Sequence, residues 1–209
     1  MPSLKTKDIP ASDLLNCEGS VHIGPAIAGL MRLPICTVDS STVIALDHLD
    51  LLPRLSVLFS RVLLPKRVRA ELFSLPGRQE RLGELSESYR FIENCDDYDQ
   101  AAVDILFSER KAYGLRDRGE AEAVVQAVEI GSMVLVDDAW GRKPAGRFDR
   151  EYHGTVWVLR RFFELGFASA ADTRVSFAKL QNHGIRLPRE AVNQFLAEIG
   201  ESPIPAENG

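Results

Sequence analysis

The chain lacks the features of secreted, disulfide-bonded and membrane proteins. Its 209 residues include three cysteines, Cys17, Cys36 and Cys95, an odd number with no CxxC pair and no zinc spacing. A disulfide framework or a structural zinc site is therefore not expected. The N-terminus has no apolar signal-peptide core, and no stretch approaches the about 18 apolar residues of a membrane span. We expect a cytoplasmic protein that does not enter a membrane.

An excess of positive charge is absent as well. The formal net charge is −5 and the pI is near 5.5, which weighs against a protein that coats nucleic acid. A nuclease is not excluded, because an acidic metal site would itself supply part of this charge. The apolar fraction of 45% and the charged fraction of 26% are those of a globular domain that folds without disulfides.

Several catalytic motifs are also missing. The chain contains no GxSxG nucleophile elbow, no GxxxxGK[ST] phosphate loop and no HExxH zinc motif. Its four histidines include no pair at positions i and i+4, and we interpret them as incidental. The sequence therefore gives no support to the chemistry that these motifs carry.

Short apolar segments alternate with amphipathic ones along most of the chain. We predict strands at 35–39, 61–64 and 132–136, a short strand in YRFIENC and an edge strand at 148–153. Helices are predicted in VIALDHLDLL, RLSVLFS, PKRVRAELF, 99–112, 119–130, GRKPAGR, TVWVLRRFFELG, TRVSFAKLQNHG and PREAVNQFLAEIG. Strands that alternate with helices predict an α/β fold with a parallel sheet between helical layers.

Three parts of the chain are expected. Residues 1–33 form an N-terminal extension with little regular structure, 34–166 form the α/β domain, and 167–202 form a C-terminal helical tail that packs on the domain. The tail carries a large apolar set, namely Leu180, Ile185, Leu187, Val192, Phe195 and Leu196. Left exposed, this set would form a larger patch than monomers tolerate, so the domain, a second subunit or a partner must cover it.

Acidic residues gather at four places, three of which follow apolar runs. Asp39 closes PICTVDSS, Glu71 lies in the helix after RVLLP, the segment DRGEAEAV is acidic, and Asp137 and Asp138 close SMVLVDD. Ligands of open parallel sheets bind outside the carboxyl ends of the strands, so these groups would share one pocket. Carboxylates in one pocket repel each other unless protons or cations join them. The pattern favours a hard divalent cation, Mg²⁺ or Mn²⁺, and metal-assisted hydrolysis.

Two of the clusters offer a choice of carboxylate. Glu120 and Glu122 lie about 200° apart on a helix and cannot both face one small site. Asp117 and Glu120 have the spacing of a capping box, so Glu122 is preferred as the metal ligand and Glu120 is the alternate. Because side chains alternate along a strand, only one of Asp137 and Asp138 is expected to face the metal. Asp138 is preferred, with Asp137 as the alternate.

Two further residues are assigned to substrate binding. Ser40 directly follows Asp39, and Arg142 lies one helical turn beyond Asp138. Arg142 can pair with the carboxylates or contact a phosphate, and a surface salt bridge explains it equally well.

With these residues in place, the sequence resembles the PIN-domain superfamily of metal-dependent nucleases. The pieces that carry the resemblance are VDSSTVIALDHL, PKRVRAELF, DRGEAEAVVQA, VLVDDAWGRKPA and HGTVWVLRRFFELG, in that order. The C-terminal KLQNHGIRLPREAVNQFLAEIGE is similar to the helical tail of a prokaryotic branch related to toxin nucleases. The resemblance covers roughly residues 35–202.

The resemblance implies a three-layer α/β/α sandwich with a central parallel sheet. It implies an acidic site for one or two Mg²⁺ or Mn²⁺ ions that hydrolyses phosphodiester bonds, usually in RNA, with Asp39, Glu71, Glu122 and Asp138 as its residues. This sequence departs from the family pattern at two positions. Glu122 stands where the family usually has aspartate, and Val136 stands where it often has threonine.

The leading hypothesis is a metal-dependent endoribonuclease, as the toxin of a toxin–antitoxin pair, with RNA as substrate and an antitoxin or a second copy as partner. The two departures keep open a non-catalytic PIN-like module that binds nucleic acid or protein. A phosphohydrolase of the haloacid-dehalogenase type is disfavoured, because Ser41 stands where that class needs a second aspartate. A receiver domain is disfavoured because the acidic pair follows a late strand.

Overall fold

The computed structural model describes residues 34–74, 89–112 and 118–205, to which all structural statements below refer. Residues Leu33–Gly209 form one compact unit. The extension predicted for residues 1–33 and the candidate cap Asp117 lie outside the described residues.

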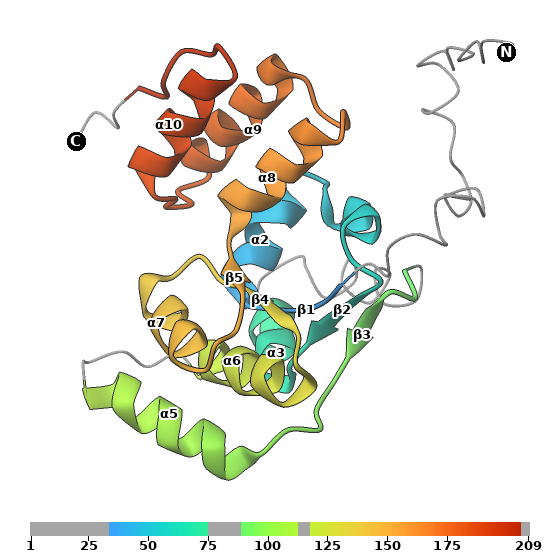
Figure 1. Ribbon diagram of the computed structural model, residues 1–209, viewed down its shortest axis with the longest axis vertical. Helices are drawn as coiled ribbons and strands as arrows, with labels where there is room; N and C mark the ends of the chain where they lie inside the picture. The colour runs from blue at the N-terminus through green and yellow to red at the C-terminus, as the bar shows by residue number, and fades with distance from the viewer. Residues whose placement is uncertain (1–33, 75–88, 113–117, 206–209) are drawn as a thin grey trace, which may run out of the picture. The chain divides into compact units, whose positions relative to one another are not determined.

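The sheet has five parallel strands in the order β3-β2-β1-β4-β5 (Figure 1). Their bounds are β1 Ile35–Val38, β2 Arg61–Leu64, β3 Ile92–Asn94, β4 Met133–Leu135 and β5 Tyr152–His153. The chain runs outward from β1 to β3 and then returns to the other side of β1. The carboxyl ends of β1 and β4 therefore flank the point at which the strand order reverses, where ligands of open α/β sheets bind.

Helices cover both faces of this sheet (Figure 1). One face carries α3 Lys66–Ser74, α6 Gly119–Ile130 and α7 Ala139–Arg147, with α5 Gln100–Ala112 packed on α6. The other face carries α2 Ser40–His48 and α8 Thr155–Glu164, with α9 Ala170–Asn182 and α10 Arg189–Glu198 packed on α8. The predicted three-layer α/β/α sandwich is confirmed. In the described part of the chain, no helix has the length and apolar character needed to cross a membrane.

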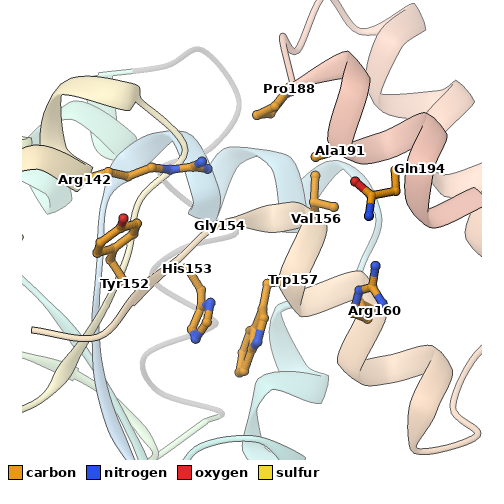
Figure 2. A pocket seen from close by; sticks show the side chains of 10 residues that line it. All are labelled: Arg142, Tyr152, His153, Gly154, Val156, Trp157, Arg160, Pro188, Ala191 and Gln194. Carbon is orange, nitrogen blue, oxygen red and sulfur yellow. The ribbon is translucent and has the colours of Figure 1, made fainter. Parts of the chain in front are cut away.

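Two predicted elements take a different form. The piece RLSVLFS belongs to a 3₁₀ helix, η2 Leu52–Val57, which begins with Pro53 in its first turn. The edge strand predicted at 148–153 shrinks to Tyr152–His153, because the chain turns at Asp149, whose φ is 54°. Aspartate tolerates this left-handed conformation better than most residues. From β5 the chain runs through Gly154 directly into α8, against which α10 packs (Figure 2).

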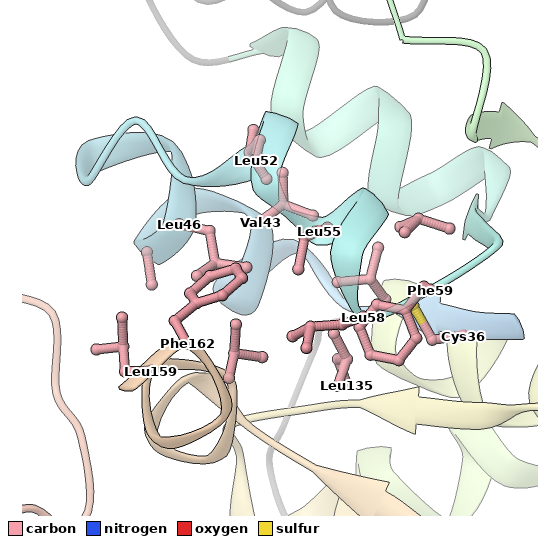
Figure 3. Close-up of a cluster of buried hydrophobic side chains, with 14 of the residues drawn as sticks. Cys36, Val43, Leu46, Leu52, Leu55, Leu58, Phe59, Leu135, Leu159 and Phe162 are labelled. Carbon is pink, nitrogen blue, oxygen red and sulfur yellow. The ribbon is translucent and has the colours of Figure 1, made fainter. Parts of the chain in front are cut away.

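The main hydrophobic core lies between the sheet and the α2–α8 face (Figure 3). Leu46, Leu55, Phe59 and Phe162 are at most 1% exposed there. Burying a side chain of this size stabilises a fold by about 1.5–3 kcal/mol. Cys36 lies in the same cluster, and its burial raises the pKa of the thiol well above its ordinary value. This cysteine is thus a small buried residue of the core.

The C-terminal helices contribute to that same core. Phe177 and Leu180 of α9 and Phe195 and Leu196 of α10 are at most 2% exposed and belong to the cluster that contains Leu46. The rings of Phe177 and Phe195 meet edge to face, with their centroids 6.2 Å apart. Four of the six apolar residues named in the tail, Leu180, Val192, Phe195 and Leu196, are thus buried, and Ile185 and Leu187 are partly buried against the same cluster.

Candidate active site

Asp39 stands at the carboxyl end of β1 and is 3% exposed. Its backbone N–H donates to the carbonyl of Leu135 at 2.9 Å, which ties it to the end of β4. Its Oδ2 accepts hydrogen bonds from the N–H of Ser41 at 3.3 Å and from the Ser41 hydroxyl at 2.6 Å. Asp39 is thereby the N-cap of α2, which fixes its carboxylate at the predicted edge of the sheet.

Glu71 reaches the same edge from α3. The Ser40 hydroxyl donates to Glu71 Oε2 at 2.9 Å, and Arg67 lies 3.6 Å from Oε1. A Cβ atom on Gly119 would stand 3.0 Å from both carboxylate oxygens of Glu71. The first residue of α6 thus approaches Glu71 closely, and this one side chain contacts α2 and α6.

Glu120 follows Gly119 and directs its carboxylate towards α7. It is 1% exposed, and its Oε1 accepts a hydrogen bond from the N–H of Gly141 at 2.7 Å. The first N–H groups of a helix have no partner within that helix and lie at the positive end of its dipole, so they stabilise a carboxylate. A Cβ atom on Gly141 would stand 2.2 Å from Glu120 Oε1 and 2.7 Å from Val136 Cγ2, so glycine is required there.

Glu122 lies on the other side of α6. Its Oε2 accepts hydrogen bonds from the N–H of Arg67 at 2.8 Å and from the Tyr98 hydroxyl at 2.5 Å. Arg118 lies 3.6 Å from its Oε1. Burial raises the pKa of Tyr98, and the hydrogen bond to Glu122 adds to this effect. Glu122 therefore binds the first turn of α3 and the segment that leads into α5.

The two aspartates after β4 lie in different surroundings. Asp137 Oδ1 accepts a hydrogen bond from the N–H of Thr155 at 2.8 Å, and Oδ2 accepts from the hydroxyls of Thr155 at 2.6 Å and Thr42 at 3.3 Å. Asp137 thus caps α8 and connects it to α2. Asp138 is exposed and immediately precedes α7. Both aspartates lie just beyond the end of β4, and their surroundings differ.

The capping box of Asp117 and Glu120 stays a prediction, because Asp117 lies outside the described residues. The N-cap of α6 is Arg118, which makes no side-chain capping bond. The described partner of Glu120 is α7, through the N–H of Gly141.

A series of contacts and chain neighbours joins four of the predicted carboxylates, Asp39, Glu71, Glu120 and Asp138. Asp39 precedes Ser40, Ser40 bonds Glu71, and Glu71 packs on Gly119, which precedes Glu120. Glu120 then bonds the N–H of Gly141, three residues after Asp138. Glu122 takes part in a separate set of contacts. Among the described residues, no three His, Cys, Asp or Glu side chains form a group arranged to hold a metal ion.

The sequence prediction missed the residues that shape this edge. Gly119 and Gly141 permit the close approach of Glu71 and Glu120, and Gly154 does the same for Asp137, whose Oδ1 would lie 2.4 Å from a Cβ at that position. Thr42 and Thr155 hold Asp137. A glycine beside a carboxylate cluster is the sequence signal that could have identified the first two.

A model of the PIN-domain family matches residues 35–201, and the chain belongs to this family. PIN domains are generally nucleases that use divalent metal ions and act on nucleic acid. No curated protein matches the chain.

Proposed function

We propose that this protein is a metal-dependent endoribonuclease whose site consists of Asp39, Glu71, Glu120 and Asp138. The observation that carries the proposal is the series of contacts that runs from Asp39 through Glu71 and Glu120 to the start of α7. Glu120 replaces Glu122 in this set, because the hydrogen bonds of Glu122 lead to α3 and Tyr98.

The donor set suits a hard divalent cation. All four groups are carboxylates, and oxygen ligands are those that Mg²⁺ and Mn²⁺ prefer. Asp39 and Glu120 are 3% and 1% exposed, and a nearby cation favours the charged form of a buried carboxylate. When bound, Mg²⁺ or Mn²⁺ would lower the pKa of a water molecule and stabilise charge on the scissile phosphate.

The remaining residues of the edge orient these groups. The N–H of Gly141 holds Glu120, and the Ser40 hydroxyl holds Glu71. Asp137 fixes the start of α8 through Thr155 and thereby the turn that carries Asp138. We assign Ser40 and Arg142 to contacts with the substrate phosphate, for which a guanidinium is well suited.

Cleavage of fluorescently labelled single-stranded RNA and DNA of the same sequence tests the proposal. We expect RNA to be cut internally with Mg²⁺ or Mn²⁺ and to stay intact with EDTA. Asp39→Asn and Glu120→Gln should each abolish cleavage while the protein remains folded by circular dichroism. Preferred cleavage of DNA would contradict the RNA assignment, and cleavage in EDTA would contradict the metal requirement.

A non-catalytic binding module is the second candidate, and a specific observation favours it. Asp39, Glu120, Glu122 and Asp137 each accept a hydrogen bond from a backbone N–H in the first turn of a helix, so the same carboxylates can serve the fold alone. RNA binding without cleavage at any concentration of Mg²⁺ or Mn²⁺ would support this candidate and exclude the nuclease.

The biological role and the cellular location of the protein are also proposals. We propose a cytoplasmic toxin of a toxin–antitoxin pair, on the strength of the resemblance of its C-terminal helices to toxin nucleases. Growth arrest on expression of the wild-type chain, relieved by Asp39→Asn, is the expected result. Light scattering of the purified chain measures whether it is a homodimer.

A further inference from the structure

A cavity of about 260 Å³ lies beside the candidate active site, between β5, the first turns of α8, and α10 (Figure 2). Its walls combine guanidinium, amide and aromatic side chains, namely Arg142, Tyr152, His153, Trp157, Arg160 and Gln194. Polar groups that converge on a concave, partly aromatic surface are typical of ligand sites.

Of the two arginines that line the cavity, one forms an ion pair within the described residues and the other does not. Arg160 pairs with Glu198 at 2.7 Å and stacks on the ring of Phe195. Arg142 donates from Nε to the carbonyl of Val136 at 3.3 Å, and its Nη2 would lie 2.9 Å from a Cβ on Gly154. Arg142 forms no ion pair within the described residues. Asp137 offsets part of its positive charge, because Asp137 Oδ1 and Arg142 Nη2 would lie 2.4 Å and 2.9 Å from the same Cβ on Gly154. The remaining charge lies at the wall of the cavity.

The start of α10 adds a second anion-attracting group. Pro188 is the N-cap of this helix of ten residues, and no side chain caps its first turn. Pro188 and Ala191 both line the cavity. Unsatisfied N–H groups and the positive end of the helix dipole favour an anion at this position. Glu190 in the same first turn opposes this effect in part.

Aromatic rings form another wall. His153 stacks on Trp157 with ring centroids 4.1 Å apart and planes 11° apart. Tyr152, beside them, is 40% exposed although its ring is large and apolar. Aromatic side chains beside positive charge are the means by which proteins bind single-stranded nucleic acid, because every base has a face that can stack.

We propose that this cavity binds one nucleotide of a single-stranded RNA, with a phosphate at Arg142 and the start of α10 and the base against Tyr152 and the stacked pair of His153 and Trp157. The proposal rests on the proposed function, because Arg142 lies one helical turn beyond Asp138 and so connects the cavity to the site of cleavage. The cavity would hold the nucleotide next to the scissile phosphate.

Fluorescence anisotropy of a fluorescein-labelled single-stranded RNA of eight nucleotides, in EDTA, tests the proposal without cleavage. We expect Arg142→Gln to raise Kd about 10-fold and Tyr152→Leu about 5-fold. Gln194→Ala, on the opposite wall, should raise Kd about 3-fold. Arg174→Gln is the matched control, because Arg174 of α9 also donates from Nε to a backbone carbonyl and makes no ion pair in the described chain. Its Kd should stay within about 2-fold of wild type.

Thermal melts of each variant separate lost binding from lost folding, and Arg142→Lys, which keeps the charge, should fall between wild type and Arg142→Gln. Equal Kd values for wild type and the three cavity variants would overturn the proposal even if the protein cleaves RNA. Cavity-dependent binding without cleavage would support it and contradict the nuclease. Competition by penta-glutamate that depends on Arg142 but not on Tyr152 would overturn it in favour of an acidic protein partner.

Discussion

The two sides of the first turn of α6 carry the same chemical group in different surroundings. Glu120 and Glu122 are 1% and 5% exposed, and each accepts a hydrogen bond from the first turn of another helix. Glu122 is also held by Tyr98 and lies near the cation of Arg118, so its charge is balanced by the fold. Glu120 follows Gly119, which packs on Glu71, and its carboxylate bonds the first turn of α7, which comes after β4. Burial therefore does not distinguish Glu120 from Glu122, and the proposed difference in their roles rests on their contacts.

The largest expected difference is that between Glu120→Gln and Glu122→Gln in RNA cleavage. Glu120→Gln should reduce the cleavage rate at least about 100-fold, because the amide cannot supply the negative charge that stabilises a metal ion. Glu122→Gln should leave the rate of the folded protein within about 3-fold and lower the free energy of unfolding by about 1–3 kcal/mol. The opposite pattern would mean that Glu122 is the ligand.

Two glycines of α7 test whether the close approach of Glu120 to this helix is needed. Gly141→Ala places a Cβ 2.2 Å from Glu120 Oε1, so it should cost about 1–3 kcal/mol of stability and displace the carboxylate. Gly146→Ala is the matched control in the same helix, since its nearest neighbour would be Tyr152 Cε1 at 3.4 Å. It should stabilise the protein by about 0.5–1 kcal/mol. Urea unfolding measures both, and equal stabilities would show that the close approach is not needed.

Tyr98→Phe tests the proposed structural role of Glu122, because it removes one of the hydrogen bonds that Glu122 accepts. Loss of the hydrogen bond to buried Glu122 should lower the free energy of unfolding by about 1–2 kcal/mol and leave RNA cleavage unchanged. A loss of cleavage that exceeds the loss of folded protein would extend the active site to Glu122.

The smallest expected effect is on the pH dependence of the stability difference between wild type and Tyr98→Phe. Burial and Glu122 raise the pKa of Tyr98 in the folded state, so the stability it contributes is present below the unfolded tyrosine pKa of about 10. It is lost as the pH rises towards the folded-state pKa. The stability difference between wild type and Tyr98→Phe should therefore be constant between pH 7 and about 9.5 and shrink above it. A difference that grows in alkaline solution would contradict the assigned direction of the shift.

The arrangement of strands and helices could be predicted because it follows from local patterns. Apolar runs such as 61–64 fix the strands, and the strand ends place Asp39 and the pair Asp137–Asp138 at one edge of the sheet. The choice between Glu120 and Glu122 could not be predicted, because it depends on where α6 begins, to within one residue, and on the approach of α7 at Gly141. Likewise, the sequence does not say which of Asp137 and Asp138, both beyond the end of β4, bonds the start of α8.

Anomalous diffraction from crystals grown with Mn²⁺ tests the proposed site most directly. We predict a peak whose coordinating oxygens, at about 2.1 Å, include those of Asp39 and Glu120. It should be lost in Asp39→Asn crystals and retained in Glu122→Gln crystals. A peak coordinated by Glu122, or full Mn²⁺ occupancy in Asp39→Asn crystals, would contradict the assignment of the active site to the Glu120 side of α6.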